Sequence, residues 1–197
     1  RKLWVRAAGA AVRVISSPAV DATSVYVSIG NGVAGPNLFA LDRDTGVERW
    51  SASVPGTPTT PPMLGANQVY VVTNTGGTTL HAYPRTSTGT PSPTWTCPNL
   101  GATQGALALA EWDWSGTTYE TVLAATALRF RALRQNGAGC VNSNIGHLVT
   151  DARDSSVSVV GLRAWYGGIS GNVATIEWIQ LDSAFDTPTV SDRGDGT

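Results

Sequence analysis

The strongest constraint on this chain is a segment that recurs after 42 to 45 residues. The first copy occupies 17–50, where short apolar runs alternate with turn residues, as expected of four consecutive antiparallel strands. Asn31-Gly32 and Asp44-Thr45-Gly46 fit the turns, because these residue types tolerate the positive φ that tight turns require. Four strands in about 35 residues make one small sheet.

The second copy repeats four features of the first in the same order. The matched pairs are Ser17-Pro18-Ala19-Val20 with Thr60-Pro61-Pro62-Met63, Val25-Tyr26-Val27 with Val69-Tyr70-Val71, Leu38-Phe39-Ala40-Leu41 with Leu80-His81-Ala82-Tyr83, and Trp50 with Trp95. One four-stranded sheet cannot bury both of its faces alone, so a repeat of about 40 residues predicts sheets packed side by side around an axis. The sequence therefore predicts an all-β propeller of four-stranded antiparallel blades.

The repeat also divides the chain. Lys2-Leu3-Trp4 resembles Glu48-Arg49-Trp50, so 1–13 is predicted to hold the closing strand of a preceding blade. Blades are predicted over 14–57 and 58–101, more divergent blades over 102–145 and 146–186, and the first strand of a further blade over 187–197. With about four blades visible, we expect part of a seven- or eight-bladed ring. A closed four-bladed ring is the alternative.

The first copy resembles the PQQ-like (pyrroloquinoline-quinone-like) propeller repeat. That repeat has Ser-Pro-x-Val, Val-Tyr-Val, Leu-Tyr-Ala-Leu-Asp, Thr-Gly and a closing Trp. The second copy matches the strands, and we interpret it as lacking the Asp and the Thr-Gly of the turn between its third and fourth strands. The resemblance implies the fold but leaves function open, because the same blades serve redox enzymes and cofactor-free scaffolds.

The cysteines separate the branches of this family. Quinone-dependent members hold their cofactor with an adjacent Cys-Cys pair, a Trp and a set of calcium ligands, whereas Cys97 and Cys140 are 43 residues apart here. The resemblance is therefore to the cofactor-free branch, which includes a lipoprotein of the bacterial machine that assembles outer-membrane proteins. Cys97 and Cys140 form either a disulfide, as extracytoplasmic proteins favour, or two buried thiols.

Composition excludes some partners. Charged residues make up 14% of the chain and the net charge is −1, so there is no basic surplus for nucleic acid or anionic membranes. No run of 18 apolar residues suits a membrane span. Trp4, Trp50 and Trp95 hold equivalent repeat positions and are predicted to pack between blades. His81 and His147 lack partners at metal-ligand spacing and are interpreted as structural.

One segment is a weak candidate for a metal site. Residues 113–120, Asp-Trp-Ser-Gly-Thr-Thr-Tyr-Glu, weakly resemble the calcium loop of integrin-type FG-GAP repeats. Asp113, Ser115 and Glu120 would be its ligands. The segment lacks most of the carboxylates of such loops, so we favour a plain hairpin turn and expect no cofactor.

The same region supplies the candidate partner contacts. Trp112, Asp113 and Trp114 are expected in an irregular loop, where exposed aromatic side chains would contact a protein, and packing over the ring is the alternative. The sequence thus favours a non-catalytic, extracytoplasmic scaffold that binds a protein or another macromolecule, such as a chain that completes the ring. The alternatives are a fragment of a quinone-dependent dehydrogenase whose cofactor site lies on other blades, and a calcium-dependent adhesion propeller.

Overall fold

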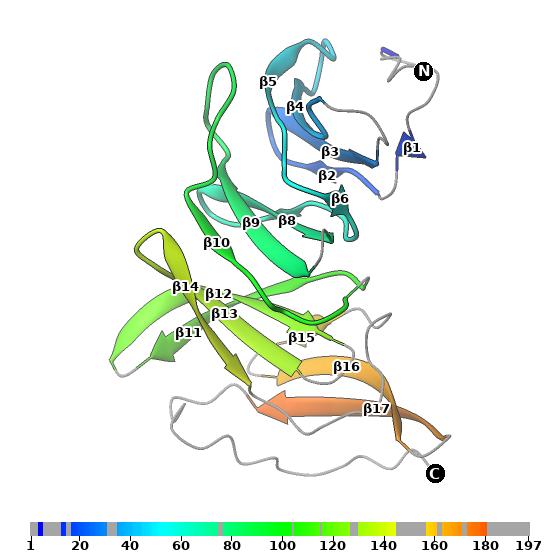
Figure 1. Ribbon diagram of the computed structural model, residues 1–197, viewed down its shortest axis with the longest axis vertical. Coiled ribbons are helices and arrows are strands. Elements are labelled where there is room, and N and C mark those ends of the chain that lie inside the picture. Colours follow the sequence, from blue (N-terminus) through cyan, green and yellow to red (C-terminus); the bar gives the residue numbers. More distant parts are fainter. Residues whose placement is uncertain are drawn as a thin grey trace. The chain divides into compact units, whose positions relative to one another are not determined.

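The computed structural model describes most of the chain as antiparallel sheet (Figure 1). The described residues are 4–5, 13–14, 17–30, 35–74, 77–103, 105–114, 116–126, 130–144, 157–160, 163–170 and 173–180. Every regular element within these ranges is a strand, and the strands form four sheets. The chain divides into two compact units, Arg1–Thr96 and Cys97–Thr197, which are described separately.

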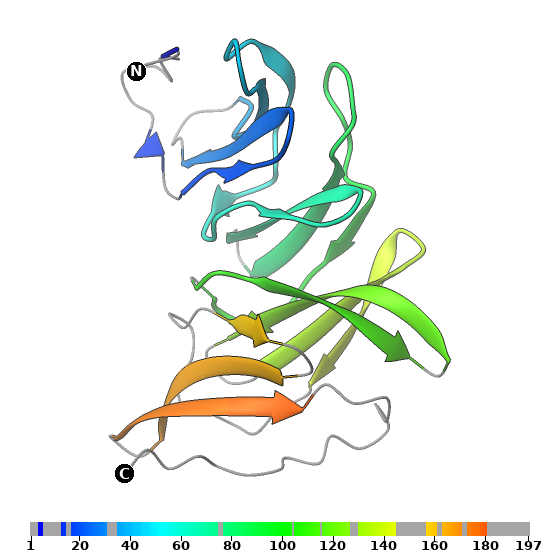
Figure 2. The ribbon, with the colours of Figure 1, turned by 180° about the vertical axis from the view of Figure 1, so that it is seen from behind.

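The first unit contains two sheets. The first sheet consists of β1 (Arg13–Val14), β2 (Ala19–Val20), β3 (Ser24–Gly30), β4 (Leu38–Asp42) and β5 (Glu48–Ala52). The second consists of β6 (Thr57–Pro58), β7 (Met63–Leu64), β8 (Gln68–Asn74), β9 (Thr78–Pro84) and β10 (Trp95–Cys97). In each sheet the last three strands pair in chain order, and the two-residue strands pair with the first of these three. Figure 2 shows the same sheets from behind.

Facing side chains of these two sheets form one core. Its buried members are Tyr26, Leu38, Ala40, Trp50, Ala52, Val54, Val69, Val71 and Tyr83. Trp50 is 1% exposed and stacks on Tyr83 with ring centroids 6.5 Å apart. Leu38 and Ala40 belong to one repeat, and Val69 and Val71 to the next. The predicted side-by-side packing of consecutive repeats is therefore present in this unit.

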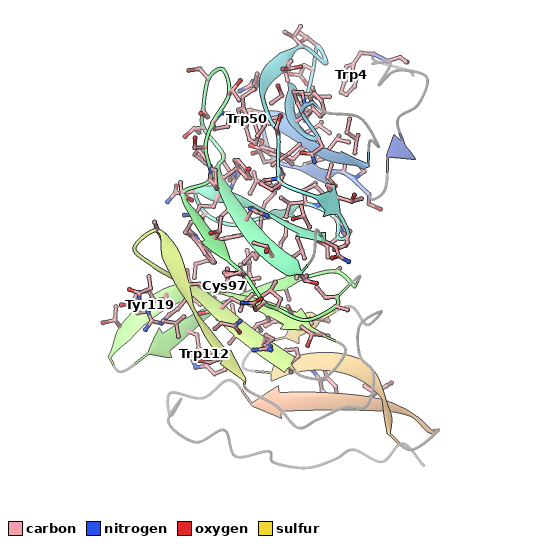
Figure 3. All side chains as sticks on the ribbon, viewed as in Figure 1. Trp4, Trp50, Cys97, Trp112 and Tyr119 are labelled. Carbon is pink, nitrogen blue, oxygen red and sulfur yellow. A yellow bond between two sulfur atoms is a disulfide. The ribbon has the colours of Figure 1, made fainter. Side chains whose placement is uncertain are left out.

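Two of the closing tryptophans donate hydrogen bonds to turns of this unit. Trp4 Nε1 donates a hydrogen bond to the carbonyl of Arg43 (2.8 Å), and Trp50 Nε1 donates to the carbonyl of Arg85 (3.2 Å). Gly46 has a φ of +73°, and a Cβ there would lie 2.6 Å from Trp4 Cδ2, so only glycine fits. Trp95 differs, because its Nε1 donates to Gln68 in its own sheet. Figure 3 labels Trp4 and Trp50.

The turn of the second copy corrects our interpretation that it lacks Thr-Gly. Thr88-Gly89 stands 43 residues after Thr45-Gly46, and Gly89 has a φ of +74°. Gly89 also lies beside Trp50, with which it forms an isolated β-bridge. The motif is therefore present, but additional residues separate it from β10.

His81 is a buried structural residue of β9, as the sequence indicated. The side chain is 5% exposed, and its Nε2 lies 3.0 Å from Thr73 Oγ1. Burial lowers the pKa of His81 to about 4 from the ordinary 6.5. His147 lies outside the described residues.

We expect the wild type to lose stability in mild acid because of His81, and we expect the His81→Gln variant to lack this loss. Between pH 6.5 and about 4, the unfolded chain binds a proton at His81 that the folded chain excludes. The free energy of unfolding therefore has its full value above pH 6.5 and falls by roughly 3 kcal/mol as the pH drops to the folded-state pKa. Urea denaturation across this range measures the effect. A wild-type and a variant curve of equal slope would contradict it.

The second unit also contains two sheets. The four-stranded sheet consists of β11 (Ala108–Trp114), β12 (Thr117–Ala125), β13 (Phe130–Asn136) and β14 (Gly139–Asn144). The other has three described strands, β15 (Ser158–Val160), β16 (Arg163–Ser170) and β17 (Val173–Gln180). Residues 187–197, predicted to begin a further blade, lie outside the described residues.

The core of the second unit joins its two sheets. Its buried members are Trp112, Leu123, Ala125, Phe130, Ala132, Val157 and Ala164. Phe130 and Ala132 lie two residues apart in β13, so they share one face of that strand, and both are fully buried. A disulfide joins Cys97, the first residue of the unit, to Cys140 in β14, with the Cα atoms 5.3 Å apart. The structure thus brings together the two cysteines for which the sequence left both states open.

Candidate functional site

The predicted partner contacts are not in an irregular loop. Strands β11 and β12 pair without interruption up to Trp114 and Thr117, and Trp112 lies opposite Tyr119. Trp112 is 6% exposed and belongs to the core of the second unit, so the expectation that it is an exposed contact is wrong. The reason is the strand pairing, which turns alternate side chains of β11 inward. Asp113 and Trp114 occupy the end of the same strand.

The weak calcium candidate is a tight hairpin. Gly116, with a φ of +85°, lies in the turn between β11 and β12. Asp113 pairs with Thr118, and Glu120 pairs with Glu111 farther along the strands. Ser115 lies outside the described residues. Across the described ranges, no group of three or more His, Cys, Asp or Glu side chains is arranged to hold a metal ion.

A polar cleft in the first unit is the candidate functional site. Its volume is about 700 Å³, and it opens where turns of the first two sheets meet. Its lining residues are Asp21, Ala22, Thr23, Ser24, Tyr26, Arg49, Trp50, Ala66, Asn67, Arg85, Thr86, Ser87 and Thr88. Three turns contribute: β2 to β3, β7 to β8, and the start of the β9–β10 connection. None of the candidate site residues predicted from the sequence lies in this cleft.

Asp21 is the acceptor at the centre of the cleft. Its Oδ1 accepts hydrogen bonds from the backbone N–H groups of Thr23 (2.8 Å) and Ser24 (2.7 Å), which closes the turn before β3. Its Oδ2 accepts from Tyr26 Oη (3.0 Å) and from Arg85 Nη2 (2.7 Å). The Thr23 hydroxyl also donates to Oδ1 (3.3 Å), so five donor groups from the two sheets and their turns converge on one carboxylate.

Arg85 carries the connection into the second sheet. Besides the ion pair with Asp21, its Nη1 donates to the carbonyls of Gly65 (2.6 Å) and Ala66 (3.1 Å). Its backbone N–H donates to Asn67 (3.0 Å), and its carbonyl accepts from Trp50. One residue therefore ties together the three turns that form the cleft. We call Asp21 and Arg85 the hub.

Hydrogen bonds stabilise the ionised forms of both hub residues. Burial opposes ionisation of Asp21, but the hydrogen bonds from Arg85, Thr23, Ser24 and Tyr26 outweigh it and hold the pKa of this carboxyl well below its usual range. The hydrogen bond to Asp21 raises the pKa of Arg85, and burial raises the pKa of Tyr26. The hub therefore keeps its charges at neutral pH, and none of these three groups is poised to exchange a proton there.

The comparisons with known proteins identify the fold. No family model matches this chain, and no curated protein sequence matches it. The chain is similar to the crystal structure of BamB from Moraxella catarrhalis, with a TM-score of 0.60 and 19% sequence identity. The similarity covers 85% of this chain and 50% of that one, so this chain spans about half the length of that structure.

The class of protein follows from the sheets and this similarity together. The fold is an all-β propeller of antiparallel sheets, which confirms the fold class predicted from the repeat. The described sheets contain five, five, four and three strands. Within the described ranges we find no helix with the length and apolar character that a membrane crossing requires.

Proposed function

We propose that this chain belongs to a cofactor-free, PQQ-like propeller scaffold that works outside the cytoplasm and binds a protein partner at the cleft around the hub. The observation that carries the proposal is the hub itself, because it fixes three turns around an open polar cleft. A rigid surface loses little conformational freedom when a partner binds. Loops held by a stiff framework are also where binding residues concentrate.

The chemistry of the cleft supports binding over catalysis. Every acceptor oxygen of Asp21 is occupied by donors of the chain itself, and Arg85 is held by Asp21 and two carbonyls. The groups left facing the opening include hydroxyls and an amide, among them Thr86, Thr88 and Asn67. Such groups suit hydrogen bonding to a partner rather than nucleophilic or acid–base work.

Two further observations support the location and the assembly. Disulfides such as Cys97–Cys140 persist in oxidising compartments, which favours a periplasmic, cell-surface or secreted protein. The match spans half of the BamB structure, and propeller sheets bury their faces against neighbouring sheets. We therefore propose that further blades, from a longer chain or a partner chain, complete a ring of seven or eight.

A photo-crosslinking amino acid placed in the cleft tests the binding site. We expect Asn67 and Thr88, both exposed in the cleft, to crosslink one discrete protein in the native cell when replaced by the crosslinker. Thr117, exposed in the β11–β12 hairpin, serves as the control position. Crosslinks at Thr117 alone, or at none of the three positions, would contradict the proposal.

A pair of arginine variants shows whether the hub shapes this site. Arg85→Met removes the ion pair and the two carbonyl contacts, and is expected to lower the crosslinking yield several-fold. Arg43→Met is the matched control, because Arg43 precedes the equivalent turn of the first copy and its side chain pairs with the exposed Asp44 at the surface. Circular dichroism checks that both variants fold. Equal yields for the two variants would exclude a role for the hub.

We expect calcium and its removal to leave the melting temperature unchanged. A bound ion stabilises the folded state in proportion to the logarithm of its concentration over Kd, so a chelator would lower the melting temperature of a calcium-dependent propeller. Thermal melts with calcium and with chelator measure this difference. A clear shift favours the adhesion alternative, and dye reduction after addition of quinone and calcium to the intact native protein favours the dehydrogenase.

A further inference from the structure

The connection from β9 to β10 is chemically unlike the rest of the chain. Residues 86–94 read Thr-Ser-Thr-Gly-Thr-Pro-Ser-Pro-Thr, with six hydroxyl side chains in nine residues and no charge. Figures 1 and 2 show this connection as a long loop that extends away from its sheet. Arg85 precedes this stretch as Arg43 precedes the equivalent part of the first sheet, 44–47, which is shorter and contains the charged Asp44.

Only two of the six hydroxyls are exposed and remote from other roles. Thr86, Ser87 and Thr88 line the cleft. Thr94 Oγ1 donates to the carbonyl of Ala82 at 3.1 Å. Thr90 and Ser92 are both exposed, and neither makes a hydrogen bond or other contact recorded within the described part of the chain. These two hydroxyls are therefore open to an enzyme.

The backbone of Thr90 and that of Ser92 are restricted to the same extended conformation. Pro91 follows Thr90 and Pro93 follows Ser92, and the residue before a proline is restricted to extended or polyproline II geometry. Neither proline has an N–H that could draw the hydroxyl into a local turn. Gly89 accepts a hydrogen bond from Ser51 N–H (3.3 Å), which anchors the segment just before them. An enzyme would thus meet an extended strand held at its base.

We propose that Thr90 and Ser92 are O-glycosylation sites. Hydroxyl-rich, proline-containing segments without charge are the composition of O-glycosylated stretches. The donor would be a sugar linked to a polyprenyl phosphate. The Oγ atom forms a bond to the anomeric carbon, the bond from that carbon to the phosphate oxygen breaks, polyprenyl phosphate leaves, and the hydroxyl proton passes to a base of the transferase.

The disulfide separates this modification from phosphorylation, which also selects hydroxyls before proline. Cys97 lies five residues beyond Ser92, and its bond to Cys140 indicates an oxidising compartment. Lipid-linked sugar donors are available to transferases in such compartments, whereas the nucleoside triphosphate that a kinase needs is a cytosolic substrate. The same observation underlies the proposed location, but the glycosylation does not depend on partner binding.

Mass spectrometry of the protein from the cells that make it tests this assignment. Trypsin cleaves after Arg85 and chymotrypsin after Trp95, which together release the peptide 86–95. We expect this peptide to carry whole sugar residues, and electron-based fragmentation to place them on Thr90 and Ser92. The double variant Thr90→Val with Ser92→Ala should lose the added mass, and the control Thr117→Val should retain it.

The outcomes are decisive in either direction. Added sugar that persists in the Thr117→Val control and is reduced several-fold when Pro91 and Pro93 are replaced by alanine supports the assignment. An unmodified peptide overturns it, as does an added mass that a phosphatase removes. Sugar on Thr86 or Thr88 alone would also overturn it, since those side chains line the cleft.

Discussion

Replacing Trp50 with alanine is expected to lower the free energy of unfolding by about 3–5 kcal/mol. The side chain is 1% exposed, contacts Tyr26 and Tyr83 from both repeats, and donates its indole N–H to Arg85. The variant leaves a cavity between the first two sheets and frees the carbonyl that fixes the turn at the hub. Urea denaturation followed by circular dichroism measures the loss, because several other tryptophans complicate fluorescence.

Two variants separate the parts of this effect. Trp50→Phe retains most of the buried ring but loses the N–H. This variant should therefore be destabilised by about 1 kcal/mol for the lost hydrogen bond, with a further small loss for the smaller cavity. Trp4→Ala removes the equivalent tryptophan at a half-buried position and should cost less than Trp50→Ala. A Trp50→Ala loss no larger than that of Trp4→Ala would show that the sheets are not held together here.

Removing the Cys97–Cys140 disulfide is expected to cost a similar amount. The bond closes a loop over a sequence separation of 43, and the loss of this constraint on the unfolded chain corresponds to roughly 4 kcal/mol. The double variant Cys97→Ala with Cys140→Ala should therefore unfold at a lower urea concentration. Alanine is preferred at Cys97, because that side chain is fully buried and serine would place a hydroxyl there.

Reductant provides the control for this second prediction. The wild type in reductant should match the double variant, and the double variant should not respond to reductant. Free thiols detected in the unreduced native protein, or equal midpoints with and without the bond, would contradict the disulfide as a source of stability.

The sequence predicted the elements that depend on local pattern. Val25-Tyr26-Val27 and Val69-Tyr70-Val71 lie in β3 and β8, because β-branched and aromatic residues favour strands. Burial alternates over the three residues in β3, whereas all three are buried in β8. The repeat of Trp4 and Trp50 indicated packing between blades, and both side chains reach a carbonyl of the turn that follows a third strand. Regular spacing was sufficient for these features.

The errors arose where pairing or insertion overrides local pattern. Trp112 lies in a segment with turn-like neighbours, but β11 pairs with β12 along its whole length, and this pairing turns the side chain into the core. Thr88-Gly89 was overlooked because Pro84 replaces the Asp that precedes the first turn, and because the connection after it is longer.

The cleft was not predicted, because its hub joins two residues that are 64 positions apart in the sequence. Asp21 and Arg85 belong to different repeats, and neither has an ionic partner near it in sequence that would indicate the pair. A signal did exist in the sequence. Arg85 occupies the position that Arg43 holds in the first copy, and few charges occur in this chain, so a charged residue at each equivalent turn was informative.

The order of residues in the β9–β10 connection has a consequence for protein engineering. Arg85 and Gly89 make their fixed contacts before Thr90, and Thr94 resumes pairing with Ala82. Foreign peptides inserted between Ser92 and Pro93 would therefore be displayed in a loop whose two ends keep their contacts with the sheets. This position is a natural graft point for an epitope tag or a reporter.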